Sequence, residues 1–173
     1  MREQLNLYAA RRALGILNVP TMQKVVNELL NEGIFDKSFL EVVYPERDVS
    51  QIVFPAFDQA LAALGVTIPG ELPAKLIIIK YHLACVCKGE VTPFRALFDL
   101  MDEVGPEDWD ELYFSGDLPG KSIGLAPLIQ LYWDYRSTCK RAMKSPEKLK
   151  LIKKAKEDFE RLFVVEAKKW LDS

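Results

Sequence analysis

Apolar residues in this chain recur at intervals of three and four, and prolines and glycines interrupt the pattern at short distances. Leu7, Ala10, Leu14 and Leu17 form the first such stripe. This spacing places side chains on one face of an α-helix, whereas a half-buried strand would need alternate residues. The chain is therefore predicted to fold as a series of short amphipathic helices.

Proline and glycine positions divide the chain into seven or eight helices, with almost no strand. Pro20 is expected to stop the first helix and Thr21 to cap the second. Thr92 is expected to cap a later helix, with Pro93 at its first position and Gly105 at its end. The predicted helices cover residues 3–17, 21–33, 37–44, 48–65, 76–89, 92–105, 125–143 and 145–170.

Two of these helices have clear predicted buried faces. The stripe of the helix at 92–105 is expected to comprise Phe94, Leu97, Phe98 and Met101. The inward residues of the last helix are expected to be Leu149, Ile152, Phe159, Leu162, Phe163 and Trp170. A chain of 173 residues, 49% of them hydrophobic, can bury such faces in one core. The predicted fold class is therefore all-α, a single domain over residues 1–173 built as an irregular helical bundle.

Cysteine usage and the lack of a long apolar run indicate a cytoplasmic protein. The odd number of cysteines (Cys85, Cys87 and Cys139) argues against a disulfide framework. The longest charge-poor run, residues 76–87, contains Lys80 and is shorter than the roughly 20 residues that a membrane span needs. We therefore expect a reduced, cytoplasmic location and no membrane partner.

Charge is distributed unevenly, although the formal net charge is only −2. Residues 89–118 contain nine acids and one base, whereas residues 140–169 contain eleven bases and five acids. Two interpretations are open: solvated faces that attract each other in the fold, or acidic and basic docking surfaces. The small net charge disfavours a nucleic-acid partner. A DNA-binding regulator using residues 21–34 stays an alternative, but six bases and six acids leave residues 1–47 neutral.

No cofactor or metal site is predicted. The stretch SGDLPGKSIG, residues 115–124, approaches a phosphate-binding loop, but three residues separate Gly116 from Gly120 where that loop has four. A turn that leads into a helix is the favoured interpretation. His82 and Cys85 share a helical face while Cys87 points away from it, so the two neighbouring thiols are not placed to bind one metal.

Acidic residues supply the main alternative to a binding role. Asp99, Asp102 and Glu103 are predicted on one helix, and Asp108 and Asp110 follow it. Neighbouring carboxylates can shift one another's pKa and can bind divalent metal. An enzyme or small-ligand binder that uses the carboxylates from Asp99 to Asp110 is therefore an open alternative. One histidine and no nucleophile–base motif favour the absence of catalysis.

Aromatic residues gather in the stretches DWDELYF and LYWDYR, between residues 108 and 136. Trp, Tyr and Arg are enriched in binding hot spots, although core packing would also account for these side chains. The leading hypothesis is a non-enzymatic protein–protein interaction module, an adaptor or an inhibitor whose partner presents a basic surface. The predicted partner-binding residues are Trp109, Tyr113, Tyr132, Trp133, Tyr135, Arg136, Asp108 and Asp110.

Overall fold

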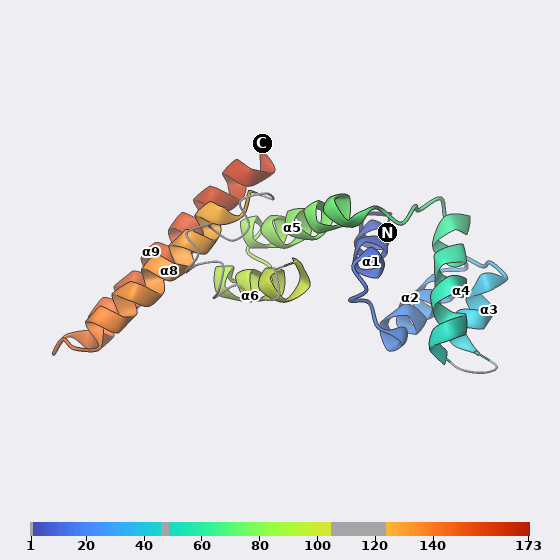
Figure 1. Ribbon diagram of the computed structural model, residues 1–173, viewed down its shortest axis with the longest axis horizontal. Coiled ribbons are helices and arrows are strands. Elements are labelled where there is room, and N and C mark those ends of the chain that lie inside the picture. Colours follow the sequence, from blue (N-terminus) through green and yellow to red (C-terminus); the bar gives the residue numbers. More distant parts are fainter. Residues whose placement is uncertain (1, 46–48, 105–123) are drawn as a thin grey trace. The chain divides into compact units, whose positions relative to one another are not determined.

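The computed structural model describes residues 2–45, 49–104 and 124–173, which are drawn as ribbons in Figure 1. These residues form eight α-helices and no strand, which confirms the predicted all-α class. None of these helices is both long enough and apolar enough to cross a membrane. The helices are α1 (Arg2–Ala13), α2 (Val19–Asn31), α3 (Ser38–Val43), α4 (Val49–Ala63), α5 (Glu71–Cys87), α6 (Pro93–Val104), α8 (Ala126–Ala142) and α9 (Lys148–Leu171).

The chain divides into two compact units, residues 1–77 and 78–173. The first unit contains α1 to α4 and the beginning of α5, and the second contains the rest of α5 with α6, α8 and α9. The boundary between the units therefore lies inside one continuous helix. The single domain expected over residues 1–173 stays a prediction.

The first unit is built around α2, α3 and α4, which pack against one another. Phe39, Phe57 and Met22 are fully buried in its core. The Arg12 guanidinium of α1 donates hydrogen bonds of 2.8 and 2.9 Å to the two carboxylate oxygens of Asp58 in α4. A paired carboxylate thus fixes α1 to α4 with two parallel hydrogen bonds, the strongest geometry for such a pair.

The start of α2 differs from the prediction because Asn18, and not Thr21, caps the helix. The Asn18 side-chain oxygen accepts hydrogen bonds from the Thr21 backbone N–H at 2.9 Å and from the Thr21 hydroxyl at 2.7 Å. Pro20 then lies in the first turn, where the helix needs no N–H from it. At α6 the predicted cap is confirmed, since the Arg95 N–H donates to the Thr92 hydroxyl oxygen at 3.4 Å.

The second unit contains a helical hairpin, in which α8 and α9 lie antiparallel and side by side (Figure 1). The α6 helix packs against α9. Phe159 of α9 is the meeting point, because its ring lies 4.4 Å from that of Phe94 in α6 and 5.6 Å from that of Tyr135 in α8. Phe163, one helical turn further along α9, is fully buried.

The buried face of α6 is shifted from the prediction, and that of α9 is narrower than predicted. Phe98 is 50% exposed, and the buried residues of α6 are Ala96, Leu97, Leu100 and Val104. On α9, Leu149 and Leu162 are exposed, whereas Phe159, Phe163 and Ala167 are buried. The buried residues of α9 recur at intervals of four, because a hairpin helix with few neighbours buries a narrow seam and not a broad stripe.

A substitution at Gly124 tests the packing at the entrance to α8. Its φ is +73°, and a Cβ there would lie 2.9 Å from Nε1 of Trp170 in α9. Gly89 has a similar φ of +75° with no atom within 4 Å of that position, so it is the matched control. We expect Gly89→Ala to cost about 1 kcal/mol for the left-handed backbone alone. Gly124→Ala should cost at least about 1 kcal/mol more in urea unfolding, because overpacking adds to strain.

The additional cost at Gly124 should disappear when Trp170 is replaced by alanine. In that background, Gly124→Ala and Gly89→Ala should destabilise the protein equally, because no side chain then opposes the added methyl group. Equal losses in the wild-type background would contradict the packing described here.

Candidate partner-binding surface

Four of the eight residues predicted to bind a partner lie on α8, namely Tyr132, Trp133, Tyr135 and Arg136. The other four predicted residues, Trp109, Tyr113, Asp108 and Asp110, lie outside the described residues, together with Lys121 and Ser122 of the glycine-rich stretch. The described part of the predicted surface is therefore a short segment of one helix. Its four side chains divide into Tyr135, which packs against rings of α6 and α9, and the other three, which contact one another.

Tyr135 faces the interior of the hairpin. Its ring meets Phe94 of α6 at 4.9 Å and Phe159 of α9 at 5.6 Å. A hydrogen bond with Cys139 raises the pKa of the Tyr135 hydroxyl, and burial raises it further. These contacts favour a packing role for Tyr135, which thereby fixes how α8 is rotated against its neighbours.

The remaining three side chains contact one another on the same helix, with Arg136 exposed and the rings of Tyr132 and Trp133 half-buried. The exposed Arg136 guanidinium lies 5.0 Å above the ring of Trp133 and 5.9 Å from that of Tyr132. The half-exposed ring of Phe98 in α6 meets Tyr132 edge-on at 5.9 Å. We call these four residues, Phe98, Tyr132, Trp133 and Arg136, the aromatic–arginine surface. Phe98 was missed as a surface residue because its stripe position predicted burial.

Two carboxylates of the catalytic alternative, Asp99 and Glu103, already contact basic side chains. Asp99 accepts from Arg95 one turn earlier on α6, with an ion-pair distance of 2.9 Å. Glu103 lies 3.2 Å from Nε2 of His82, the buried histidine on α5. Within the described residues, no three His, Cys, Asp or Glu side chains are grouped as a metal site. These contacts favour structural roles for Asp99 and Glu103, while Asp108 and Asp110 lie outside the described residues.

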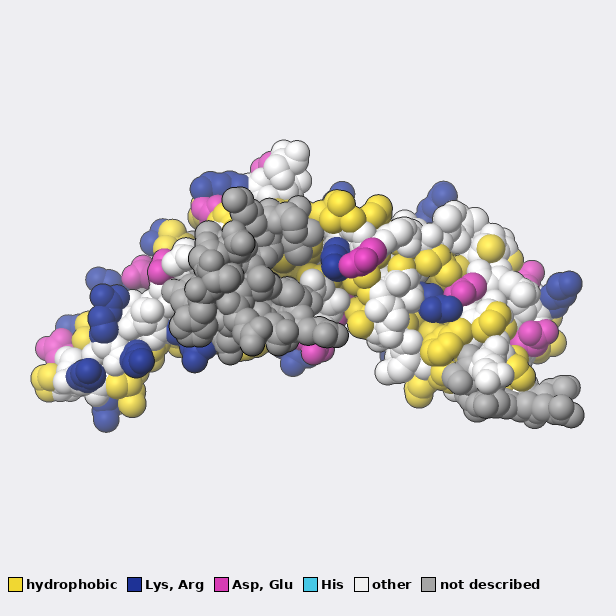
Figure 2. Space-filling view, viewed as in Figure 1, with side chains coloured by type: hydrophobic (Ala, Val, Ile, Leu, Met, Phe, Trp, Pro, Cys, Tyr) yellow, Lys and Arg dark blue, Asp and Glu magenta, His cyan; other side chains and the backbone are white. Residues whose placement is uncertain are grey.

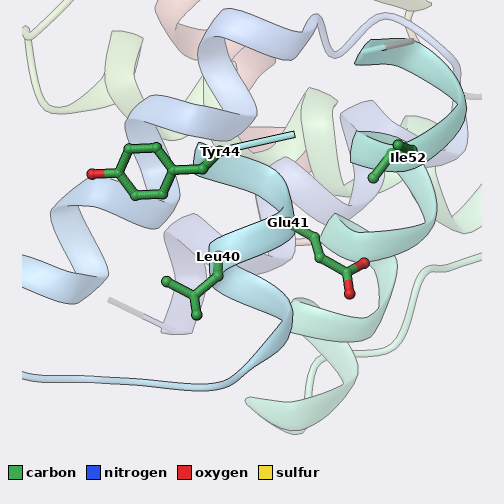
Figure 3. A pocket seen from close by; sticks show the side chains of 4 residues that line it. All are labelled: Leu40, Glu41, Tyr44 and Ile52. Carbon is green, nitrogen blue, oxygen red and sulfur yellow. The ribbon is translucent and has the colours of Figure 1, made fainter. Parts of the chain in front are cut away.

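The first unit has a hollow of about 600 Å³ beside α3, which sequence reasoning did not predict. Figure 3 shows its lining side chains, which come from α3 and the residue after it and from α4. The lining residues are Leu40, Glu41, Tyr44 and Ile52. Tyr44 is 73% exposed and Leu40 is 48% exposed. The sequence contained one signal of this hollow, a six-residue helix with apolar side chains on both faces. Because Phe39 and Val42 fill the inner face, the apolar side chains of the other face are left at the surface.

A second hollow, of about 430 Å³, lies at the end of α8 and the turn after it and has a cationic lining. It is lined by Ser137, Lys140, Arg141 and Lys144. Figure 2 shows Lys and Arg side chains gathered at the end of the helical hairpin, at the left of the view. The basic character predicted for residues 140–169 is thus displayed on the surface of the second unit.

Variants at Glu103 test its contact with His82. Glu103→Leu should lower the free energy of unfolding by about 1–3 kcal/mol, because the buried His82 nitrogen loses this polar partner. Glu103→Gln should cost less, since its amide can still form a hydrogen bond. Asp102→Leu on the exposed side of α6 is the control and should change stability by less than about 0.5 kcal/mol. Chemical denaturation would show the contact to be unimportant if all three variants matched wild type.

Alkylation of Cys85 tests its environment. Burial raises the pKa of this thiol, and a hydrogen bond with Glu90 raises it further. The reactive thiolate fraction should therefore appear at higher pH than in N-acetylcysteine amide. A variant that keeps Cys85 alone, Cys87→Ser with Cys139→Ser, should show a rate profile for iodoacetamide shifted to higher pH. A profile shifted to lower pH would contradict this environment.

Comparisons of the chain with protein-family models, with curated proteins and with solved structures found no match. The functional assignment therefore depends on the chemistry of the chain's own surface. Within the described residues, two neighbouring features have side chains suited to binding a partner. They are the aromatic–arginine surface and the cationic hollow next to it.

Proposed function

We propose that this protein acts without catalysis, by binding another protein through the aromatic–arginine surface, in the manner of an adaptor or an inhibitor. The observation that carries the proposal is the exposed Arg136 guanidinium stacked above Trp133 and Tyr132. Trp, Tyr and Arg are the residue types most enriched where truncation costs a complex most of its affinity.

The stacking of Arg136 also prepares the surface for binding. A guanidinium held over an aromatic ring loses less side-chain freedom when a partner arrives, and it keeps its planar edge available for hydrogen bonds. The half-exposed Phe98 adds apolar area beside Tyr132. A partner could therefore bury rings and pair with a cation in one small region.

The two alternatives receive less support. In the catalytic alternative, Asp99 and Glu103 already contact Arg95 and His82. In the DNA-binding alternative, α2 uses Met22, Val25, Val26 and Leu29 to fill the core, and its Lys24 lies 3.9 Å from Glu28. A helix with one base next to acids would attract phosphate weakly.

The proposal places the protein in the cytoplasm. The odd number of cysteines supports this location, because reduced thiols are typical of that compartment. All three cysteines are free thiols in the structure.

Replacement of Arg136 tests the proposed function. Arg136→Ala removes the exposed guanidinium, leaves the rings in place, and should leave the melting temperature nearly unchanged. A protein captured from native cells by the wild type should bind this variant at least about 30-fold more weakly, which corresponds to about 2 kcal/mol. Arg161→Ala on α9 is the matched control, since Arg161 is exposed and contacts only its helical neighbour Asp158 among the described residues.

The outcome against the proposal is equally specific. If every captured protein bound wild type, Arg136→Ala and Arg161→Ala with the same affinity, the aromatic–arginine surface would have no part in binding.

A further inference from the structure

The aromatic–arginine surface continues along α8 as a line of cations. Arg136 and Lys140 lie four residues apart on one face of α8, and Lys144 follows in the turn just after the helix ends at Ala142. Arg141 lies next to this line, and Ser137 completes the lining of the 430 Å³ hollow. All four basic side chains are exposed. We call these residues, Arg136, Ser137, Lys140, Arg141 and Lys144, the α8 basic stripe.

The positive charge of the stripe is not neutralised by neighbours within the described part of the chain. None of its four cations forms an ion pair there, and Arg141 only donates to the Thr138 hydroxyl at 3.3 Å. On α9 the pattern differs, because Lys153 lies 3.9 Å from Glu157 and Lys156 lies 3.8 Å from Glu160. Lys148, Lys150 and Lys154 of α9 are exposed and form no ion pair within the described residues either, but they do not line the hollow, which belongs to the stripe.

We infer that the α8 basic stripe binds a short acidic segment of the partner protein, an inference that rests on the proposed function. From Arg136 to Lys144 the stripe covers nine residues, and their eight steps extend about 12 Å at the helical rise of roughly 1.5 Å per residue. An extended peptide covers that length with about four residues at roughly 3.3 Å each. Carboxylates of such a segment meet Lys140, Arg141 and Lys144, while an apolar residue at one end packs beside Arg136 and Trp133.

A short acidic peptide fits the surface better than a long polyanion does. Nucleic acid or an anionic bilayer extends well beyond 12 Å and would meet the acids of the same hairpin. These are Asp134 on α8, Glu147 at the turn, and Glu157, Asp158 and Glu160 on α9. These acids reduce the attraction of the hairpin for a continuous polyanion, while a short segment meets the stripe alone. The 430 Å³ hollow also favours a compact group, such as one carboxylate side chain, over the flat surface of a bilayer.

The inference differs from the basic partner expected from the sequence. That expectation depended on the acids from Asp102 to Asp117, of which all but Asp102 and Glu103 lie outside the described residues, and it stays a prediction. The described binding residues carry positive charge, so complementarity selects a partner of the opposite sign.

Titration of the full chain with defined peptides tests the inference. The probe is the hexapeptide Leu-Glu-Glu-Asp-Glu-Glu, and Leu-Gln-Gln-Asn-Gln-Gln is its neutral counterpart. In two-dimensional ¹H–¹⁵N spectra, the acidic peptide should shift the amides around residues 136–144, and the neutral peptide should shift none. The dissociation constant should rise with salt, because screening shortens the reach of exposed charges.

Two triple variants of equal charge separate a specific site from a general field. Lys140→Gln, Arg141→Gln and Lys144→Gln together should weaken binding of the acidic peptide at least 10-fold. Lys148→Gln, Lys150→Gln and Lys154→Gln on α9 together should weaken it less than 2-fold. Equal weakening by both sets, or no binding of the acidic peptide to wild type, would overturn the inference.

Parallel titrations address the other anions. A single-stranded DNA 12-mer and phosphatidylserine vesicles should bind more weakly than the acidic peptide. If either bound more tightly and both triple variants weakened it equally, the hairpin would be a polyanion-binding surface and the inference would be wrong.

The capture experiment keeps the two proposals distinguishable. In one outcome, a captured partner requires Arg136 but binds the Lys140→Gln, Arg141→Gln, Lys144→Gln variant as tightly as wild type. That result would agree with the proposed function and contradict the inference of an acidic segment. A partner indifferent to Arg136 would remove the proposed function itself.

Discussion

Phe159 holds together three helices of the second unit, and the orientation of α8 depends on it. Its ring contacts Phe94 of α6, Tyr135 of α8 and Phe163 of α9 at 4.4 to 5.6 Å. Once Tyr135 is turned inward to meet it, the next residue, Arg136, must lie about 100° further round the helix. Interior aromatic packing therefore determines which α8 side chains reach the solvent.

Much of the helical fold follows from the sequence, because apolar spacing and turn residues are local signals. The cap at Thr92 was predicted because proline at the first helical position marks the start clearly. At α2 the sequence predicted Thr21 as the cap, but Asn18 caps the helix because its side chain reaches both the N–H and the hydroxyl of Thr21, a competition between neighbouring polar residues. Such competition is decided by geometry that a sequence pattern does not contain.

The candidate surface was harder to predict than the helices that carry it. Tyr135 and Tyr132 share a helical face, yet Tyr135 meets Phe159 while Tyr132 meets the half-exposed Phe98. The difference depends on where α6 and α9 cross α8, which is a tertiary property. Exposure of Phe98 has the same origin, since its helical spacing equals that of a core residue.

The position of Lys140 and Arg141 within α8 has an energetic consequence. Both lie in the last turn of the helix, where unpaired carbonyl groups carry partial negative charge. Cations there gain about 0.3–1 kcal/mol each from the helix dipole, which offsets their mutual repulsion. Positive charge can therefore accumulate at this end without weakening the helix. Residues placed for binding often lower the stability of the fold. Here the same two cations would attract a partner and also stabilise the C-terminal end of α8.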